Sequence, residues 1–320
     1  MMLWVIKMFD CHYDLLTYIY MNRKNLNQVI PHCKKIFNNN ITGGIFNLFY
    51  MSKQEMKEEL NIESNEIDII QNLKEVNSLI KENKIIPNNI KYIIGIEGLD
   101  YLENIDHIDE MYLLGVRSTG IVWNNDNKFG SGVRGTKTRG LTKLGEELIE
   151  KLVDKKIAID LSHANEKTFH NIINKCKQLK LQGKKPIVFA SHSNAKMCAN
   201  VPRNLNDGQL LEIQKLDGVI GVVSVKEFCT TAKNANYEMA YIKHINYLKE
   251  LFGGVDNIAV ATDDMSYYKI EPEYYQNMNV FKQENVKSKI EKLLIENNYT
   301  KEEIEKILAK NVEEKILEQL

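Results

Sequence analysis

The chain has 320 residues, and its 42 basic and 43 acidic residues give a net charge of −1. This balance provides no electrostatic footprint for a nucleic acid or an anionic membrane surface, and no apolar run approaches the roughly 18 residues that a membrane-spanning helix needs. The hydrophobic content of 43% is ample for a sizeable core. We therefore expect a globular protein with no nucleic-acid partner and no membrane partner.

Cysteine usage and the N-terminal sequence bear on the compartment. The 5 cysteines are an odd number, are scattered and form no C-x-x-C pair, which suits a reducing compartment better than a disulfide framework. The first residues lack the basic segment, long apolar core and small-residue cleavage site of a secretory signal. These features predict a cytoplasmic location.

Short apolar runs recur along the chain, and each is followed by polar residues or glycine. Near-continuous apolar runs are typical of strands in a parallel sheet that is buried on both faces. The eight predicted strands are residues 3–9, 41–49, 92–96, 116–122, 157–161, 187–190, 219–223 and 258–261.

Most of the segments between these runs carry apolar residues at helical spacing on a charged background. The predicted helices are residues 54–60, 67–85, 144–152, 166–179, 209–216, 240–251 and 286–296. A capping box at Thr300 and Glu303 predicts a further helix that ends near Leu317. Two stretches without periodicity, residues 123–141 and 263–279, are predicted as long loops after the fourth and eighth strands.

The repeated order of strand then helix, with eight predicted strands over 320 residues, favours a (β/α)8 TIM barrel. We expect one catalytic domain over residues 1–320, with a C-terminal helix. A doubly wound open sheet would share the alternation, but no glycine-rich phosphate turn follows the first strand. Both long loops would then lie on the face where barrel enzymes carry out chemistry.

Residues suited to metal chemistry stand at the carboxyl ends of the predicted strands. They are Asp10, His12 and Asp14 after the first strand, Glu97 after the third, His163 after the fifth, His192 after the sixth and Asp263 after the eighth. Since alternate residues of an extended chain point the same way, the three side chains after the first strand are expected to converge, with Cys11 and Tyr13 facing away.

These residue types indicate a metal site, because imidazole nitrogen and carboxylate oxygen are ligands that zinc and similar divalent ions accept. Three histidines, one glutamate and one aspartate are too many for a single four-coordinate ion that keeps an open position. They suit two divalent ions, with zinc favoured. Such a pair, bridged by a carboxylate and a water, would make that water a nucleophile and polarise a substrate carbonyl. Asp263 would remain free to move protons.

Several short motifs, in this order, carry a resemblance to a known family. They are Asp10-Cys11-His12-Tyr13-Asp14, Gly43-Gly44, Gly95-Ile96-Glu97-Gly98, Leu114-Gly115-Val116-Arg117, Gly140-Leu141-Thr142, Ile159-Asp160-Leu161-Ser162-His163, Ser191-His192-Ser193, and Arg203-Asn204 followed by Asp207. The chain resembles the membrane (renal-type) dipeptidases, which are binuclear-zinc members of the amidohydrolase-like barrels. The match extends from about Phe9 to the C-terminal helix.

The resemblance implies a role for each strand-end ligand. His12 and Asp14 would bind one zinc ion, His163 and His192 would bind the other, and Glu97 would bridge the two. Outside these ligands, the resemblance implies that Asp263 transfers a proton, and that Arg203 grips the free carboxylate of the substrate. A planar guanidinium is suited to that task because it pairs with a carboxylate through two hydrogen bonds.

The chain departs from the family pattern at three points. Trp123 stands where the best-known members have a histidine that contacts the substrate carbonyl, so it offers an indole donor or a wall of the substrate site. After the eighth strand, the chain reads Asp263-Asp264-Met265-Ser266 in place of Asp-Phe-Asp-Gly. The signal, lipid-anchor tail and bridging cysteines of the membrane-bound members are not apparent, so the soluble bacterial branch is the better comparison.

The predicted function is a metallo-dipeptidase that uses two divalent ions and a metal-bridging hydroxide to hydrolyse dipeptides. Asp263 and Glu97 are the predicted catalytic residues, and Arg203 and Trp123 are the predicted substrate contacts. A small peptide is the expected partner, and the resemblance leaves a homodimer open. The alternatives are a related hydrolase of N-acyl amino acids, cyclic amides or lactones, and a catalytically impaired metal-binding homologue.

Overall fold

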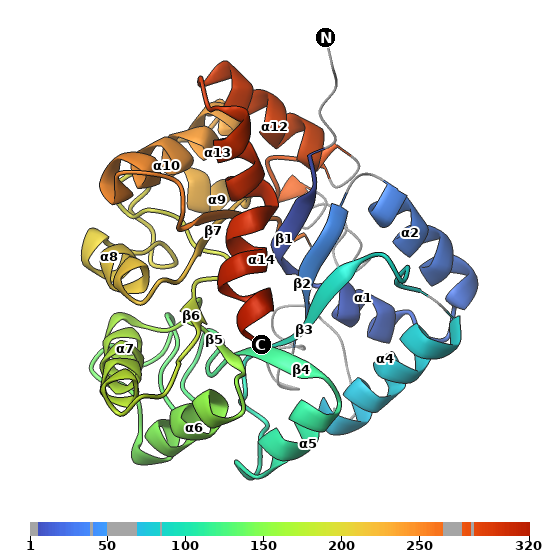
Figure 1. The fold of residues 1–320 in the computed structure, drawn as a ribbon, viewed down its shortest axis with the longest axis vertical. Coiled ribbons are helices and arrows are strands. Elements are labelled where there is room, and N and C mark those ends of the chain that lie inside the picture. Colours follow the sequence, from blue (N-terminus) through green and yellow to red (C-terminus); the bar gives the residue numbers. More distant parts are fainter. Residues whose placement is uncertain (1–5, 39–40, 50–68, 84, 265–276, 283–284) are drawn as a thin grey trace.

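The computed structural model describes residues 6–38, 41–49, 69–83, 85–264, 277–282 and 285–320. Within these residues, strands and helices alternate along the chain (Figure 1). The strands are β1 (Met8–Tyr13), β2 (Ile41–Phe49), β3 (Lys91–Glu97), β4 (Val116–Gly120), β5 (Ala158–Asp160), β6 (Val188–Phe189), β7 (Ile220–Val223) and β8 (Ile258–Ala261). The helices are α1 (Leu15–Met21), α2 (Leu26–Asn38), α4 (Ile69–Asn83), α5 (His107–Leu113), α6 (Lys143–Asp154), α7 (Glu166–Leu181), α8 (Asp207–Lys215), α9 (Lys226–Cys229), α10 (Tyr237–Phe252), α12 (Val286–Glu296), α13 (Lys301–Glu305) and α14 (Asn311–Lys315).

The eight strands are parallel and form a closed barrel. Strands β1 to β6 make one sheet in chain order, and β7 pairs with β8. A parallel bridge between Ala190 and Ile220 joins β6 to β7. Between β8 and β1, the Asp263 N–H donates to the carbonyl oxygen of His12 over 3.0 Å. The predicted (β/α)8 barrel is therefore confirmed.

The other predicted strands lie at the observed positions, several of them shorter than expected, but the first strand was predicted at residues 3–9 and is found at Met8–Tyr13. Asp10 and His12 therefore lie within β1 and not after it. β2, β8 and α12 have the predicted bounds, whereas β6 has only 2 residues. The predicted helix at 54–60 lies outside the described residues, as does most of the predicted loop 263–279. Helices α1, α2 and α5 were not predicted. α1 and α5 have 7 residues each, and α2 contains Pro31, so their sequence patterns are weak.

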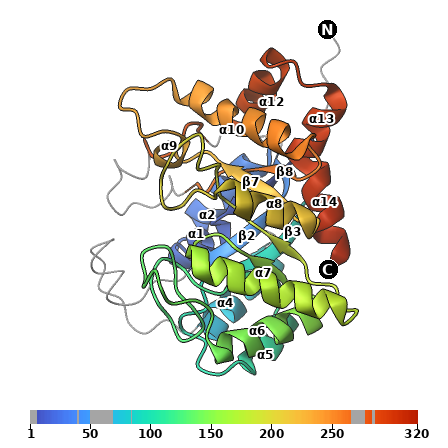
Figure 2. The same ribbon diagram turned by 90° about the vertical axis from the view of Figure 1, so that its left-hand side faces the viewer.

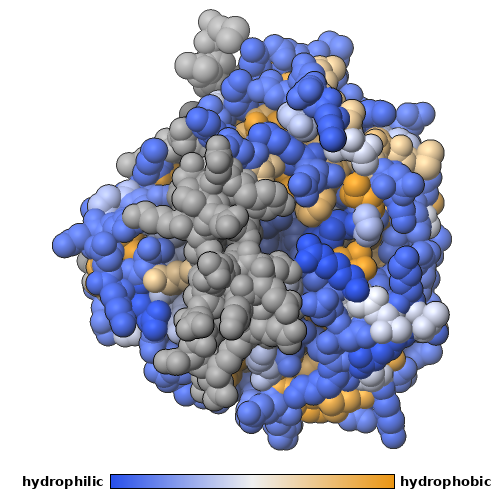
Figure 3. All heavy atoms as spheres, turned by 180° about the vertical axis from the view of Figure 1, so that it is seen from behind, coloured by the Kyte–Doolittle hydropathy of each residue, from blue (hydrophilic) through white to orange (hydrophobic). Residues whose placement is uncertain are grey.

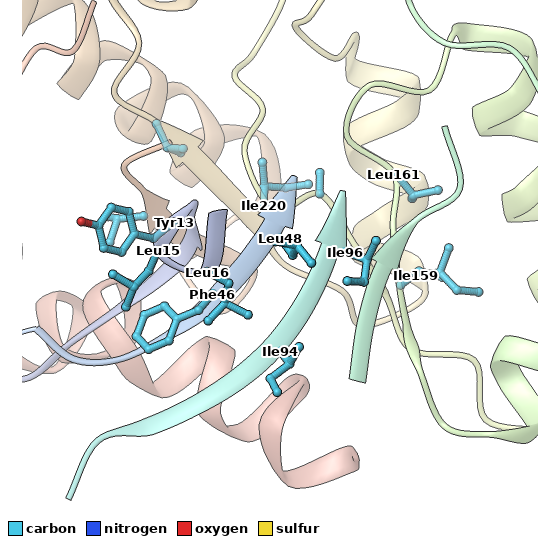
Figure 4. Packing of buried hydrophobic residues seen from close by; sticks show 14 of the residues in the cluster. Tyr13, Leu15, Leu16, Phe46, Leu48, Ile94, Ile96, Ile159, Leu161 and Ile220 are labelled. Carbon is cyan, nitrogen blue, oxygen red and sulfur yellow. The ribbon is translucent and has the colours of Figure 1, made fainter. Parts of the chain in front are cut away.

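The core has two parts. The larger part lies between the strands and the surrounding helices, and Figure 4 shows Phe46 and Leu48 of β2 beside Leu15 and Leu16 of α1. The smaller part fills the barrel interior, where Gly221 is required: a Cβ atom there would lie 1.9 Å from the carbonyl oxygen of Ser191.

The C-terminal helical segment closes the N-terminal end of the barrel. Its apolar side chains Ala309, Val312 and Ile316 belong to the interior part of the core. A π-helical turn over Lys306–Lys310 precedes α14, and the Asn311 side chain donates to the carbonyl oxygens of Val255 and Ile258, over 2.7 and 2.8 Å. Figure 2 shows this segment on one side of the barrel and the long loops on the other. The opposite end of the barrel is therefore the one left for a site.

No helix within the described parts of the chain combines the length and the apolar character that crossing a membrane requires.

Candidate metal centre

Five polar side chains converge at the carboxyl ends of the strands, on the face opposite α14. We call them the metal-centre cluster; they are His12, Asp14, Glu97, His163 and His192. Each has at most 9% of its surface exposed. Figure 3 views the molecule from this side, where hydrophilic side chains predominate. In barrels of this type, chemistry takes place at this end of the strands.

Glu97, the last residue of β3, lies between the histidines. Its Oε1 is 2.8 Å from Nε2 of His163 and 3.3 Å from Nε2 of His192. Its Oε2 is 3.7 Å from Nε2 of His12. One carboxylate thus faces imidazoles from three different strand ends, and the Nε2 atoms of His163 and His192 are themselves 2.9 Å apart.

Two buried atoms of the cluster have no hydrogen-bond partner within the described structure. They are Nε2 of His12 and Oδ1 of Asp14, which lie 3.7 Å apart. Asp14 precedes helix α1, yet its side chain makes no cap hydrogen bond there. Buried polar atoms are normally hydrogen-bonded, so a nitrogen and a carboxylate oxygen left free side by side fit a bound cation. The donor set is therefore suited to a divalent metal ion.

A hydroxyl group holds two of the imidazoles. Ser191 Oγ lies 3.0 Å from Nδ1 of His12 and 2.6 Å from Nδ1 of His192, and it donates to Oδ2 of Asp160 over 2.5 Å. Because its own proton points to Asp160, the oxygen can accept from the Nδ1–H of His192, while Nδ1 of His12 lies 3.0 Å from the Asn47 amide nitrogen as well and can accept from it. This arrangement orients both Nε2 atoms toward the cluster, as the outer hydrogen bonds of metal-binding histidines do.

The third imidazole has a separate support. Nδ1 of His163 lies 2.9 Å from Oδ1 of Asn124, in the loop after β4. His163 also has a backbone φ of 68°, and Asp263 has a φ of 48°. Left-handed backbone is costly for residues other than glycine and tends to occur at functional sites.

Asp10 supports the centre through the backbone. Its carboxylate accepts from the hydroxyl and the N–H of Thr262, over 2.5 and 2.9 Å, and from the His12 N–H over 3.2 Å. It thus joins β1 to the end of β8. Burial raises the pKa of Asp10 to about 7, although the Thr262 hydrogen bonds oppose this shift.

The predicted alternation after the first strand is only partly correct. His12 and Asp14 do converge, but Cys11 packs in the barrel interior and Tyr13 in the outer core. The register of β1 against β2 is irregular between Asp10 and Tyr13, and this irregularity breaks the simple alternation of faces.

The protonation states in the metal-free cluster follow from burial and charge. Burial alone would raise the pKa of Glu97, but the charges of His12 and His163 outweigh it and hold that pKa well below the usual value. Burial lowers the pKa of His163 to about 4 and that of His192 well below 6.5. The ionised carboxylate and neutral imidazoles are the forms that bind metals. At His12, burial alone would lower the pKa, but the charges and side-chain contacts of Glu97 and Asp14 together outweigh it and raise the pKa well above 6.5.

Two further predicted residues lie at the edge of the cluster. Oδ1 of Asp263 is 3.9 Å from Nε2 of His12. Arg203 donates to the carbonyl oxygen of His192 over 3.3 Å, and its guanidinium carbon is 5.4 Å from the centre of the Phe228 ring. Both side chains therefore lie against members of the metal-centre cluster.

Trp123 lies against the centre as well. It is 8% exposed, and its ring centre is 5.9 Å from that of His163 and 4.8 Å from that of Phe49. The structure thus brings together the side chains that the sequence analysis assigned to the metal, catalytic and substrate-binding roles. Ser191 and Asn124 were missed: the serine next to His192 was a signal that could have been used, whereas nothing in the local sequence indicates Asn124.

A (β/α)8 barrel with imidazoles gathered around a carboxylate at its C-terminal rim defines the class of amidohydrolase-like, metal-dependent hydrolases. The sequence model of the membrane dipeptidase family, peptidase family M19, matches residues 2–319. The chain therefore belongs to this family of metallo-dipeptidases, as its motifs predict.

Curated relatives are similar over part of their length. An uncharacterized protein from the pqqA 5′ region of Klebsiella pneumoniae is 34% identical over 192 residues, which cover 57% of this chain and 66% of that protein. An uncharacterized protein from the PQQ-III 3′ region of Acinetobacter calcoaceticus is 28% identical over 232 residues, 68% of this chain and 70% of that protein. The aligned region of this chain thus spans about two thirds of the length of each of these relatives.

Solved structures share the fold over nearly the whole chain. A metallopeptidase from Rhodobacter sphaeroides, liganded with a phosphinate mimic of the dipeptide L-Ala-D-Ala, superposes with a TM-score of 0.75 at 20% identity, covering 98% of this chain and 99% of that one. The probable dipeptidase PvdM from Pseudomonas aeruginosa has a TM-score of 0.74 at 14% identity, covering 98% and 96%. At these identities, the similarity establishes the fold.

Proposed function

We propose that this chain, acting as one catalytic unit over residues 1–320, hydrolyses the peptide bond of dipeptides with the help of two divalent metal ions, zinc being the favoured metal. The observation that carries the proposal is the position of Glu97. One oxygen faces His163 and His192 at 2.8 and 3.3 Å, and the other faces His12 at 3.7 Å. A carboxylate between two groups of donors is the arrangement that a pair of ions requires.

In this proposal, His12 and Asp14 hold one ion, His163 and His192 hold the other, and Glu97 is shared. Two ions bound there would supply Lewis acidity toward the substrate carbonyl and an activated, bridging water. The five ligand side chains are buried, which keeps bulk water away and strengthens charge interactions within the site.

Asp263 is the proposed proton-transfer residue. Burial raises the pKa of its carboxyl well above the usual value, together with the charges of Asp14 and Glu97, while His12 and Arg203 oppose the shift. A raised pKa favours the protonated form of this carboxyl. A departing amine needs that proton when the peptide bond breaks.

Arg203 and Trp123 are the proposed substrate contacts. Arg203 is fixed by its hydrogen bond to the carbonyl oxygen of His192, and its guanidinium would pair with the free carboxylate of a dipeptide. Trp123 would form a wall of the substrate site beside His163 and could offer its indole N–H. We further propose that the protein is cytoplasmic. Its proposed partner is a small peptide, with no nucleic acid or membrane partner. The proposed assembly is a homodimer, which light scattering tests.

The proposal is tested by metal removal and restoration. Protein treated with a chelator should lose hydrolysis of Ala-Ala, and added Zn²⁺ should restore it. N-acetyl-alanine, a hydantoin and a lactone serve as controls for the related hydrolases. Hydrolysis that survives the chelator, or that favours one of these controls over dipeptides, would contradict the proposal.

A further inference from the structure

A cavity of about 390 Å³ opens beside the metal centre, and we call it the side cavity. His163 and Arg203 contribute to its wall, so it is continuous with the proposed substrate site. Its other lining residues come from the loops that follow β4, β5 and β6 and from the first turns of α7 and α8. The volume lies in the range of small-molecule sites, about 300 to 1,000 Å³.

The side cavity is positively charged. Its described lining includes three cationic side chains, Lys137, Lys196 and Arg203, and one carboxylate, Glu166. Glu166 accepts a hydrogen bond from the Asn206 side chain over 3.3 Å. No ion pair of Lys137, Lys196 or Arg203 with a carboxylate occurs within the described residues, although the charges of Asp263 and Glu97 act on Arg203 and oppose the lowering of its pKa by burial. The cavity therefore has more positive charge than its own wall neutralises.

Several lysines elsewhere on the barrel do form ion pairs. Lys151 lies 2.7 Å from Asp106 and 2.9 Å from Asp109, and Lys306 lies 2.9 Å from Asp256. The two lysines of the side cavity differ from these in forming no ion pair within the described residues. A concave wall of one charge sign attracts ligands of the opposite sign.

The backbone holds both lysines in place. The Asn165 side chain donates to the carbonyl oxygen of Thr136, over 3.0 Å, directly before Lys137. The N–H of Lys196 donates to the carbonyl oxygen of Leu205 over 2.8 Å. A binding site on an anchored backbone loses less conformational entropy when its ligand arrives.

We propose that Lys137 and Lys196 bind the acidic side chain of the dipeptide's C-terminal residue, so that the substrates are dipeptides ending in glutamate or aspartate. This inference rests on the proposed function, in which Arg203 takes the free carboxylate of that same residue. Arg203 and the two lysines line the same cavity. The residue whose main-chain carboxylate pairs with Arg203 is therefore the residue whose side-chain carboxylate can reach Lys137 and Lys196.

The test compares substrates that differ only in charge. The specificity constant kcat/KM is measured for Ala-Glu and Ala-Gln, each with both configurations of the second residue, and for Glu-Ala and Gln-Ala. We expect Ala-Glu to exceed Ala-Gln by about 10-fold, the ratio typical of one hydrogen-bonded charge. The ratio should fall as NaCl is raised, because salt screens exposed charges. Glu-Ala should have no advantage over Gln-Ala.

The variants assign the effect to the cavity. In Lys137→Met/Lys196→Met, the ratio of Ala-Glu to Ala-Gln should fall to about one. Lys196→Glu should move the preference toward Ala-Lys. Lys34→Met is the control. It removes an exposed lysine of the outer helix α2 that does not line the side cavity, so the wild-type ratio should be kept.

The outcomes separate this inference from the proposed function. Equal hydrolysis of Ala-Glu, Ala-Gln and Ala-Ala would leave the dipeptidase proposal standing and overturn the inference. A preference for Ala-Glu that survives the double lysine variant, or a preference for Glu-Ala instead, would also overturn it. Failure to hydrolyse any of these dipeptides in the presence of Zn²⁺ would overturn the proposed function itself.

Discussion

The two ends of the barrel use buried side chains in opposite ways. At the N-terminal end, Val312 and Ile316 are fully buried among apolar neighbours. At the C-terminal rim, His12 and Asp14 are almost as buried, but each has an atom without a hydrogen-bond partner in the described structure. Burial stabilises the first end and costs free energy at the second, which indicates that the rim is kept for ligand binding and not for stability.

The largest expected effect comes from the rim. Asp263→Asn should reduce kcat for dipeptides by about 10² to 10⁴-fold, since it removes the proposed proton carrier. Metal content, measured by mass spectrometry, and the unfolding free energy should stay close to wild type. An undiminished kcat would exclude Asp263 from the mechanism.

The matching change at the other end should affect stability instead. Ile316→Ala leaves a cavity in the interior core and should cost about 2 to 5 kcal/mol of unfolding free energy. Urea denaturation measures this loss, and Glu318→Ala, nearby and exposed, is the control. If Ile316→Ala lowered the metal content of the folded protein instead, it would be wrong to assign stability to the N-terminal end of the barrel and metal binding to the rim.

A smaller effect, on metal affinity, is expected from a residue that contacts the proposed metal ligands. Ser191→Ala removes the hydroxyl between the imidazoles of His12 and His192, and metal affinity should fall by about 10 to 100-fold. The control is Ser193→Ala, because Ser193 Oγ lies 3.4 Å from Ser162 Oγ and makes no hydrogen bond to these imidazoles within the described structure. Equal zinc affinity in the two variants, measured by competition with a chelator, would argue against this support.

The smallest effect concerns pH. His244 is fully buried, accepts from the Ala195 N–H over 3.2 Å, and has its other ring nitrogen 3.0 Å from the carbonyl oxygen of Cys229. Burial lowers its pKa from 6.5 to about 4. Between these values the unfolded chain binds a proton that the folded chain does not, so His244 contributes stability above pH 6.5 that is lost as pH falls toward 4.

The size of this loss is about 1.4 kcal/mol per pH unit at most. His244→Gln should remove that part of the slope of unfolding free energy between pH 6.5 and 4. Urea denaturation of both proteins across this window measures the difference. The same slope in both would show that His244 does not titrate as described.

The sequence predicted the parts of the molecule that depend on local pattern. The bounds of β2 and β8, the capping box at Thr300 and the strand-end histidines follow from apolar runs and the residues after them. The structure brings those histidines together because parallel strands end at one rim. In each case, the residues that form the predictive pattern lie within a few positions of one another in the sequence.

Contacts between distant segments could not be predicted in this way. Thr262 binds Asp10 across 252 positions of the sequence, and Asn124 reaches His163 from another loop. The charge of the side cavity likewise depends on Lys137 and Lys196, which lie in different loops. These features arise from how the loops pack, and no local periodicity encodes them.

The central claim is that the metal-centre cluster holds two ions around Glu97. The most direct measurement is anomalous X-ray diffraction at the zinc edge from crystals grown with Zn²⁺. The account predicts two peaks, one beside His12 and Asp14 and the other beside His163 and His192, with Glu97 touching both. A zinc-loaded crystal without peaks among these side chains, or with a single peak that Glu97 does not contact, would contradict it.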